Sequence, residues 1–278
     1  MSAAQRIEAF RVLHRSGCFV IPNPWDLGSA RWLRGLGFKA LATTSLGFAF
    51  AQARRDQDVP VDMMLDHIAA IVACVPDLPV NADFENGYAD DPDGVAANVT
   101  RCLATGVAGL SIEDATGRAD APLYDFDLAV ARVAAARRAI DRAGSGALLT
   151  ARADGVLVRG PEALDDACRR LAAFAAAGAD VLYAPGPRTR EEIAAVVAAA
   201  AGKPVNMLMF GDLGHSVDDL AALGVRRISV GGALARVAWS AFIRAAELIA
   251  RQGSFAGFAD NAASRPLNAF FGDDRPKW

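Results

Sequence analysis

Two carboxylates stand two residues apart in the stretch 79–85, PVNADFE, which begins as an apolar run. Alternate residues of a strand point to the same face, so Asp83 and Glu85 are expected to project together. Like charges held side by side raise each other's pKa or recruit a cation. Oxygen ligands without His or Cys nearby favour Mg²⁺, with Mn²⁺ as an alternative. The spacing therefore predicts a divalent metal site, with Glu113 as a nearby third carboxylate.

A carboxylate-binding site is predicted beside this metal. Arg152 ends another apolar run, and an arginine facing a metal suits a substrate carboxylate gripped in a bidentate way. The backbone N–H groups of Ser45, Leu46 and Gly47 are expected to bind a further carboxylate oxygen, since glycine permits a close approach. This setting suits a 2-oxo acid, whose enolate forms when a bond at C3 breaks. A structural ion-pair cluster around Arg152 is the alternative.

The elements that must position these residues follow from eight short apolar runs, at 18–24, 39–45, 79–84, 109–114, 147–154, 181–186, 204–210 and 226–232. Segments with helical periodicity, such as 161–179, lie between them, and several end in the glycine expected of a helix C-cap. Eight alternating strand–helix units predict a closed (β/α)8 barrel over residues 1–250. An open doubly wound sheet is the alternative, but no G-x-G-x-x-G follows the first run.

A barrel carries its active site at the carboxyl ends of its strands, and polar residues gather at those ends. They are Asn23 with Trp25 and Asp26, Thr44 to Gly47, Asp83 with Glu85, Glu113 with Asp114, Arg152 with Asp154, Tyr183, and Asn206. Polar residues are common where a loop begins, and this explains Asn23 or Asp154 taken singly. It does not explain why four carboxylates lie on neighbouring strands, namely Asp83, Glu85, Glu113 and Asp114. Trp25 and Asn206 are predicted to contact the substrate.

The composition limits the classes of partner. The 278 residues carry a net charge of −3 and are 53% hydrophobic, which suits a sizeable core and gives no general attraction to nucleic acid or anionic membrane. No apolar run is long enough to span a bilayer, and the first residues are typical of a helix rather than a signal peptide. Four scattered cysteines without metal-site spacing predict a reduced, cytoplasmic setting.

The last segment, 251–278, differs in character from the rest. It is rich in aromatic residues, namely Phe255, Phe258, Phe270, Phe271 and Trp278. Aromatic side chains after the eighth strand predict an extension that packs on another surface, with a neighbouring subunit as the expected one.

Five stretches together resemble the isocitrate lyase and phosphoenolpyruvate mutase superfamily: TSLGFAFA, RRDQDVP, NADFENGY, GLSIED and TARADG. The resemblance runs from about residue 23 to 230. It implies a (β/α)8 barrel, a homotetramer with the eighth helix swapped between subunits, bound Mg²⁺ and a pyruvate-like enolate. By position it implies Asp83 and Glu85 as paired metal carboxylates, Glu113 as a further one, Asp56 as a catalytic carboxylate and Arg152 as the substrate-binding arginine.

The loop 113–127, EDATGRADAPLYDFD, departs from the pattern of this superfamily. The lyases carry a Lys-Lys/Arg-Cys-Gly-His motif there, and the mutases a lysine and an asparagine, none of which is present. Arg118 and Tyr124 are the candidates for a catalytic role in the loop, against a solvated gating loop as the alternative. His14 and His67 fall in expected helices, whereas His215 follows the seventh strand as a candidate acid or base, with loop capping as the alternative.

The predicted function is that of a Mg²⁺-dependent lyase that cleaves a C–C bond of a small 2-oxo or 2-hydroxy di- or tricarboxylate. Decarboxylation is included, because it needs no cysteine acid at the cleavage step. One alternative is C–P bond chemistry, as in phosphonopyruvate hydrolases or the mutases. A second is a catalytically weak member that binds ligand without turning it over.

Overall fold

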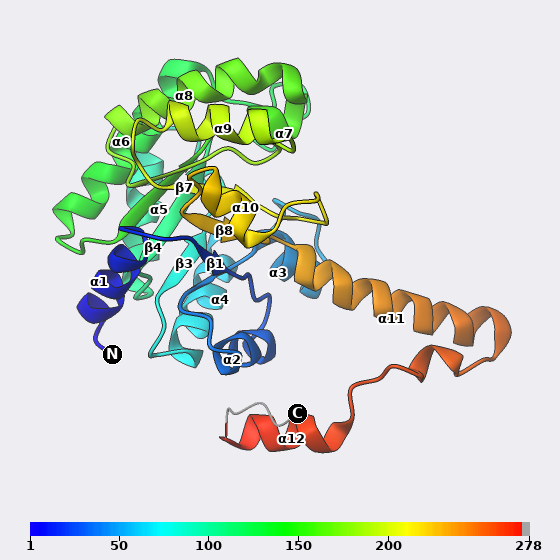
Figure 1. Cartoon of the computed structure of the whole chain (residues 1–278). Coiled ribbons are helices and arrows are strands. Elements are labelled where there is room, and N and C mark those ends of the chain that lie inside the picture. Colours follow the sequence, from blue (N-terminus) through cyan, green and yellow to red (C-terminus); the bar gives the residue numbers. More distant parts are fainter. Residues whose placement is uncertain (274–278) are drawn as a thin grey trace.

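Eight parallel strands form one sheet in the computed structural model, which describes residues 1–273, so Trp278 lies outside the described residues (Figure 1). Each predicted run contains one strand. The strands are β1 (Phe19–Ile21), β2 (Leu41–Ala42), β3 (Val80–Asp83), β4 (Gly109–Glu113), β5 (Leu148–Arg152), β6 (Val181–Tyr183), β7 (Val205–Leu208) and β8 (Arg227–Ser229). Neighbours follow the order β1-β8-β7-β6-β5-β4-β3-β2.

The sheet closes into a barrel along the seam between β1 and β2. Here the N–H of Ala42 donates to the carbonyl of Pro22 at 3.1 Å. The side chain of Asn23 spans the same seam: Nδ2 donates to the Thr43 carbonyl at 2.9 Å, while Oδ1 accepts from the N–H groups of Val230 and Gly231. The predicted (β/α)8 barrel is confirmed, and Asn23 belongs to its closure.

Helices surround the barrel. They are α1 (Ala3–Leu13), α2 (Leu27–Gly35), α3 (Ser45–Ala51), α4 (Val61–Cys74), α5 (Pro92–Ala104), α6 (Phe126–Arg142), α7 (Gly155–Arg159), α8 (Leu164–Ala176), α9 (Arg190–Ala199), α10 (Val217–Ala222), α11 (Ala233–Gln252) and α12 (Ser264–Asp273), with 3₁₀ turns η1 (Pro161–Ala163) and η2 (Ala256–Phe258). Side-chain caps begin several of them, as Asp26 does for α2 and Thr189 for α9.

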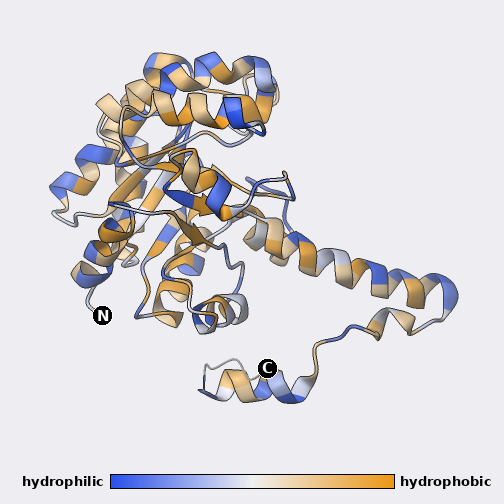
Figure 2. Ribbon diagram, viewed as in Figure 1, coloured by the Kyte–Doolittle hydropathy of each residue, from blue (hydrophilic) through white to orange (hydrophobic). Residues whose placement is uncertain are grey.

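The strands are rich in hydrophobic residues, as parallel strands covered by helices must be (Figure 2). All five residues of β4 are buried. The main core lies between the sheet and the helices α2 to α9. Inside the barrel the side chains are polar, so the barrel has a polar interior within an apolar shell.

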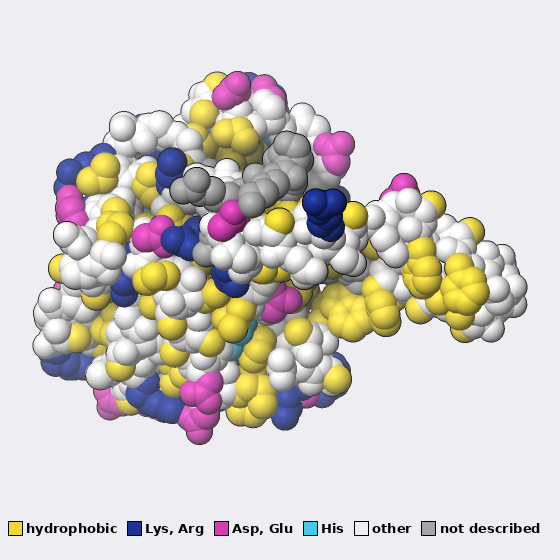
Figure 3. Space-filling view, turned by 90° about the horizontal axis from the view of Figure 1, so that it is seen from below, with side chains coloured by type: hydrophobic (Ala, Val, Ile, Leu, Met, Phe, Trp, Pro, Cys, Tyr) yellow, Lys and Arg dark blue, Asp and Glu magenta, His cyan; other side chains and the backbone are white. Residues whose placement is uncertain are grey.

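The last elements leave the barrel. Helix α11 projects away from it and buries only Ala235, while Val237, Phe242 and Ile243 are exposed (Figures 1 and 3). The chain then returns, and α12 lies against α2, with the rings of Phe270 and Trp32 4.4 Å apart. Part of the aromatic segment therefore packs on its own barrel, and packing of 251–278 on a neighbouring subunit stays a prediction. Within residues 1–273, no helix combines the length and the apolar character needed to cross a membrane.

Candidate active site

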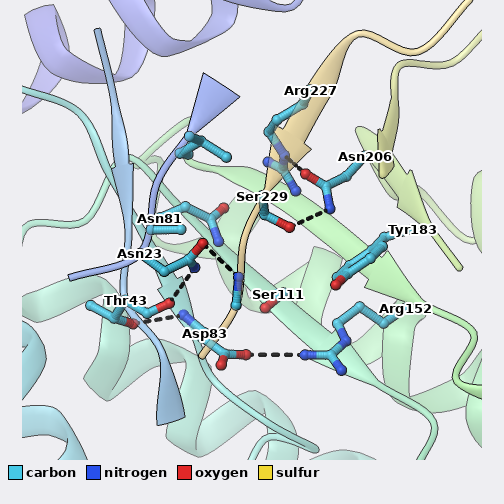
Figure 4. Close-up of a pocket in the computed structure, with 13 residues that line it drawn as sticks. Asn23, Thr43, Asn81, Asp83, Ser111, Arg152, Tyr183, Asn206, Arg227 and Ser229 are labelled. Atoms are coloured by element: carbon cyan, nitrogen blue, oxygen red, sulfur yellow. Dashed lines mark hydrogen bonds and ion pairs between the residues drawn. The ribbon is translucent and has the colours of Figure 1, made fainter. Parts of the chain in front are cut away.

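One row of side chains crosses five neighbouring strands in register. Glu113 pairs with Arg152, Arg152 with Tyr183, Tyr183 with Asn206, and Asn206 with Arg227. Because barrel strands are tilted, a row in register runs obliquely from one end of the barrel towards the other. The row therefore descends from the carboxyl end of the strands into the barrel, and it orders these side chains by depth (Figure 4).

Two cavities lie above one another along this row. The outer one, here called the mouth cavity, has about 670 Å³ of empty space. It is lined by Thr44, Ser45, Leu46, Asp56, Gln57, Asp83, Glu85, Glu113, Ala115, Arg152, Asp154, Leu157, Val158, Tyr183, Leu208, Gly231 and Gly232. The inner one, here called the interior cavity, has about 390 Å³ and reaches Asn206 and Arg227. Asp83, Arg152, Tyr183 and Gly231 line both and form the boundary between them.

Arg152 is held among three carboxylates at this boundary. Its Nη1 lies 3.1 Å from Asp83 Oδ1 and 3.0 Å from Glu113 Oε2, and its Nη2 lies 3.0 Å from Asp154 Oδ1. Burial raises the pKa of Glu113 well above its usual range, although Arg152 opposes this. One guanidinium thus faces three carboxyl groups, and a further cation would favour their ionised forms.

Asp83 connects this cluster to the start of α3. Its Oδ2 accepts from both the N–H and the hydroxyl of Ser45, at 3.0 and 2.9 Å. The N–H of Asp83 itself donates to Thr43 Oγ1 at 2.9 Å. The carboxylate is therefore fixed by two strands and a helix N-terminus, which is how a buried charge is stabilised when its partners are preorganised.

Glu85 and Asp56 complete the acidic group. Glu85 has a left-handed backbone (φ 45°), and its buried Oε1 has no hydrogen-bond partner among the described residues. Burial, together with the charges of Asp83 and Asp56, raises the pKa of Glu85 to about 8. Burial and the charge of Asp83 also raise the pKa of Asp56. An unpartnered buried oxygen beside two further carboxylates is a place that a cation would satisfy.

The residues present fit a magnesium ion with few protein ligands. Within residues 1–273, no three His, Cys, Asp or Glu side chains are arranged to hold a metal ion by themselves. Mg²⁺ usually keeps several waters and takes only one or two carboxylates together with oxygens of the substrate. Asp83 and Glu85, with Glu113 behind them, meet that requirement without a complete protein cage.

The predicted carboxylate site at Ser45, Leu46 and Gly47 is partly occupied by the protein itself. The N–H of Ser45 donates to Asp83, and the N–H of Gly47 donates to the N-cap oxygen of Thr44 at 3.2 Å. For the N–H of Leu46 the described residues provide no acceptor, and Leu46 lines the mouth cavity. One of the three predicted donors is thus available to a ligand.

Glycine is required at position 47 by packing, whereas the predicted reason was the close approach of a ligand carboxylate. A Cβ at this position would lie 2.8 Å from Thr44 Cγ2, 2.9 Å from Trp25 Cβ and 3.2 Å from Ala235 Cβ. The glycine therefore makes room for these neighbours and not for a substrate. Trp25 does not line the mouth cavity. It lines an outer groove with Ala51 and residues of α11.

Replacing Gly47 with alanine is expected to lower the free energy of unfolding by about 1–3 kcal/mol, the usual cost of overpacking. Urea unfolding measures it. Gly28→Ala is the matched control, since a Cβ there meets its nearest atom at 3.6 Å, an ordinary contact, and alanine favours the helix α2. Equal stability of the two variants would contradict the packing role of Gly47.

Asn206 lies below the predicted site. Its Nδ2 donates to Ser229 Oγ at 2.9 Å, and its Oδ1 accepts from Arg227 Nε at 2.8 Å (Figure 4). The oblique row places it in the interior cavity. Conversely, Tyr183, Asp154 and Gln57 line the mouth cavity although no role was predicted for them. Their only signal in the sequence was a position at the end of a strand or beside Asp56.

The sequence model of the phosphoenolpyruvate phosphomutase family matches residues 10–250 of the chain.

The chain belongs to this family. A crystal structure from Burkholderia cenocepacia J2315, provisionally named a lyase/mutase, shares 49% identity with a TM-score of 0.92 and covers 99% of each chain. The crystal structure of 2,3-dimethylmalate lyase, a member of the phosphoenolpyruvate mutase/isocitrate lyase superfamily, is 28% identical, with a TM-score of 0.83 over 99% of this chain and 96% of that one. Oxaloacetate decarboxylase of Paraburkholderia xenovorans is 31% identical over 95% of this chain and 88% of its own length. The predicted superfamily and the prediction of an enzyme are confirmed.

In this member of the phosphomutase family Ala115 lines the mouth cavity, whereas the part of the loop after β4 that carries Arg118 and Tyr124 lies outside it. Arg118 pairs with Asp90 at 3.0 Å, and the hydroxyl of Tyr124 donates to the same carboxylate at 2.5 Å. Neither Arg118 nor Tyr124 lines the mouth cavity. The loop therefore brings no catalytic proton donor to the site in this conformation.

The three histidines are also outside the mouth cavity. His14 and His67 are buried, and burial lowers the pKa of His14 to about 3 and that of His67 to about 4. His215 is half-buried, and its Nε2 contacts the Arg188 carbonyl at 2.7 Å. His14 and His67 are core residues within helices or at their ends, and His215 ties two loops together.

Proposed function

We propose that this protein is a Mg²⁺-dependent lyase that breaks a C–C bond of a small dicarboxylate: a 2-oxo acid would react through a pyruvate-type enolate, and a 2-hydroxy acid through the enediolate of the departing carboxylate. The observation that carries the proposal is the arginine among three carboxylates, next to an available backbone donor, on the floor of one cavity. The named relatives, a decarboxylase of oxaloacetate and a lyase of dimethylmalate, support the substrate class.

Each residue has a defined part in this proposal. Asp83 and Glu85 would hold the ion, with Glu113 behind them. Mg²⁺ bound there supplies a positive charge for the carboxylate and keto oxygens of a 2-oxo acid. The guanidinium of Arg152 and the N–H of Leu46 bind the substrate carboxylate and orient the bond to be broken. Asp56, whose pKa is raised by burial, is placed to exchange a proton with a 2-hydroxyl group.

Decarboxylation is the favoured reaction among C–C cleavages. It requires no acid to protonate a carboxylate-stabilised leaving group, and the loop after β4 supplies none. The same loop lacks the lysine and asparagine expected for C–P bond chemistry. The chain is thus better equipped to stabilise an enolate than to transfer a phosphoryl group.

A turnover screen with Mg²⁺, coupled to detection of pyruvate, or of glyoxylate for isocitrate, tests the proposal. The panel comprises oxaloacetate, alkyl-substituted malates, 2-methylisocitrate, isocitrate and phosphonopyruvate. Turnover of a carbon acid but not of phosphonopyruvate is expected. Turnover of phosphonopyruvate alone would replace the proposal by C–P chemistry. Oxalate binding without any turnover would leave a ligand-binding protein.

The acidic group predicts how stability depends on pH. The pKa of Glu85 is about 8 in the folded protein against a usual 4.5, so between these values the folded chain keeps a proton that the unfolded chain has released. The free energy of unfolding of the metal-free protein is therefore expected to fall as the pH rises through about 8. Mg²⁺ should stabilise the protein more at about pH 8.5 than at about pH 6, because it binds the ionised form.

Thermal unfolding in EDTA and in MgCl₂ across this pH range measures both effects. Glu85→Gln removes the titrating group and should flatten the profile in EDTA. A metal-free protein whose melting temperature rises between about pH 6 and about pH 8.5 would contradict the assignment.

A further inference from the structure

Enolate chemistry requires a group that gives a proton to carbon, and the usual positions do not provide one. The loop after β4 has no Cys, Lys or His, and its tyrosine is bonded to Asp90. The described residues that line the mouth cavity include several carboxylates, Arg152 and one further titratable side chain, which is that of Tyr183. The carboxyl groups of Glu85 and Glu113 are assigned to the ion in the proposed function, so Tyr183 is the first remaining neutral donor to consider.

Tyr183 occupies the middle of the oblique row, between Arg152 and Asn206. It lines both the mouth cavity and the interior cavity, so it stands at the boundary between them. Figure 4 shows its ring between Asn206 and Arg152, with the hydroxyl end directed toward the centre of the barrel on the side of Ser229. A substrate held by Arg152 and Asp83 would lie next to this hydroxyl.

The surroundings of Tyr183 keep its phenol protonated at rest and stabilise a short-lived phenolate. The guanidinium carbon of Arg152 lies 5.1 Å from the centre of the Tyr183 ring. Burial raises the pKa of Tyr183 to about 12, while the charge of Arg152 opposes the rise. The side chain is thus protonated at neutral pH, and the neighbouring cation stabilises the phenolate that remains after transfer.

The interior cavity gives the phenolate a route back to its protonated form. Polar side chains of Ser111, Asn206 and Ser229 line this cavity directly below the ring. A polar cavity of this kind is a setting for ordered water, and it approaches Tyr183 from the side opposite to the substrate. Proton supply and reaction therefore take place on two sides of one residue.

We propose that Tyr183 is the proton donor that converts the enolate into pyruvate, an inference that rests on the proposed function. The O–H bond of the phenol breaks, and its electron pair stays on the phenolate oxygen. The π electrons of the C2–C3 double bond form the new C3–H bond, and the enolate oxygen becomes the keto oxygen of pyruvate. In the reverse direction the phenolate removes a proton from C3 of bound pyruvate.

Exchange of the pyruvate methyl protons with D₂O, followed by ¹H NMR with Mg²⁺ present, tests this step without any bond cleavage. The wild-type protein is expected to catalyse exchange. Tyr183→Phe keeps the ring beside Arg152 and loses the hydroxyl, so exchange should slow by a factor of about 10²–10⁴, the range for a general acid–base residue. Oxalate affinity and melting temperature of this variant should match those of the wild type.

Tyr124→Phe is the matched control, because that hydroxyl contacts Asp90 outside the cavity, and it should exchange at the wild-type rate. Wild-type exchange in Tyr183→Phe, or no exchange in the wild type itself, would overturn the role of Tyr183. Failure of the proposed function looks different: oxaloacetate and the malates would persist while pyruvate still exchanged its protons.

Discussion

Replacing Arg152 with alanine should remove oxalate and substrate binding and lower the free energy of unfolding by about 3–5 kcal/mol, the range for removing one partner of a buried ion pair. The guanidinium contacts Asp83, Glu113 and Asp154 within 3.1 Å, so its loss leaves three carboxylates without their cation. Binding should weaken by at least a factor of about 10, since a charge-assisted hydrogen bond contributes about 1.5–3 kcal/mol.

Urea unfolding and oxalate titration measure the two effects of this substitution. Because protons or Mg²⁺ can neutralise the carboxylates left behind, the loss of stability should be smaller at about pH 5, and smaller with added Mg²⁺. Arg169→Ala is the control: this exposed arginine pairs with Asp166 at the surface and should change stability by no more than about 0.5 kcal/mol. Intact oxalate binding in Arg152→Ala would remove Arg152 from the site.

Asp83→Asn is expected to weaken Mg²⁺ binding by a factor of about 10–100 and to slow turnover by about 10²–10³. The amide keeps the shape of the carboxylate and one acceptor for Ser45, but it removes the charge that faces Arg152 and the ion. The effect on binding should therefore exceed the effect on folding.

Calorimetric titration of Mg²⁺ in the presence of oxalate measures the affinity of the Asp83 variant. Asp90→Asn supplies a control, because Asp90 is an exposed carboxylate that pairs with Arg118 outside the cavity. Equal Mg²⁺ affinity in the wild type and in Asp83→Asn would mean that the ion binds elsewhere.

Much of the site could be predicted because two simple rules act together. Short apolar runs between helices identify the eight strands, and the barrel then brings their carboxyl ends to one place. Ser45, Leu46, Asp56, Asp83, Glu85, Glu113 and Arg152 all line the mouth cavity. For these residues other than Asp56, the order along the chain was enough to place them, whereas Asp56 was predicted only from the resemblance to the superfamily.

Depth within the barrel was not available from the sequence. Arg152 is the last residue of β5, whereas Asn206 is the second residue of β7, and the tilt of the strands places Asn206 in the interior cavity. The same tilt brings Tyr183 to the boundary, although a tyrosine at a strand end is typical of a core residue. Gly47 permits the approach of Trp25 and Ala235, contacts between segments far apart in the chain that no local pattern indicates.

The seam between β1 and β2 has a consequence for the local opening of the barrel. Strand β2 has two residues, and the N–H of Ala42 is its hydrogen bond to the β1 side, whereas β4 and β5 pair over five positions. Local opening starts where few hydrogen bonds must break together. In native-state hydrogen exchange the amide of Ala42 should lose protection before those of β4. A ligand held by the N–H of Leu46, shortly after β2, should slow that exchange, so amide protection at this seam would report occupancy of the cavity without any catalytic assay.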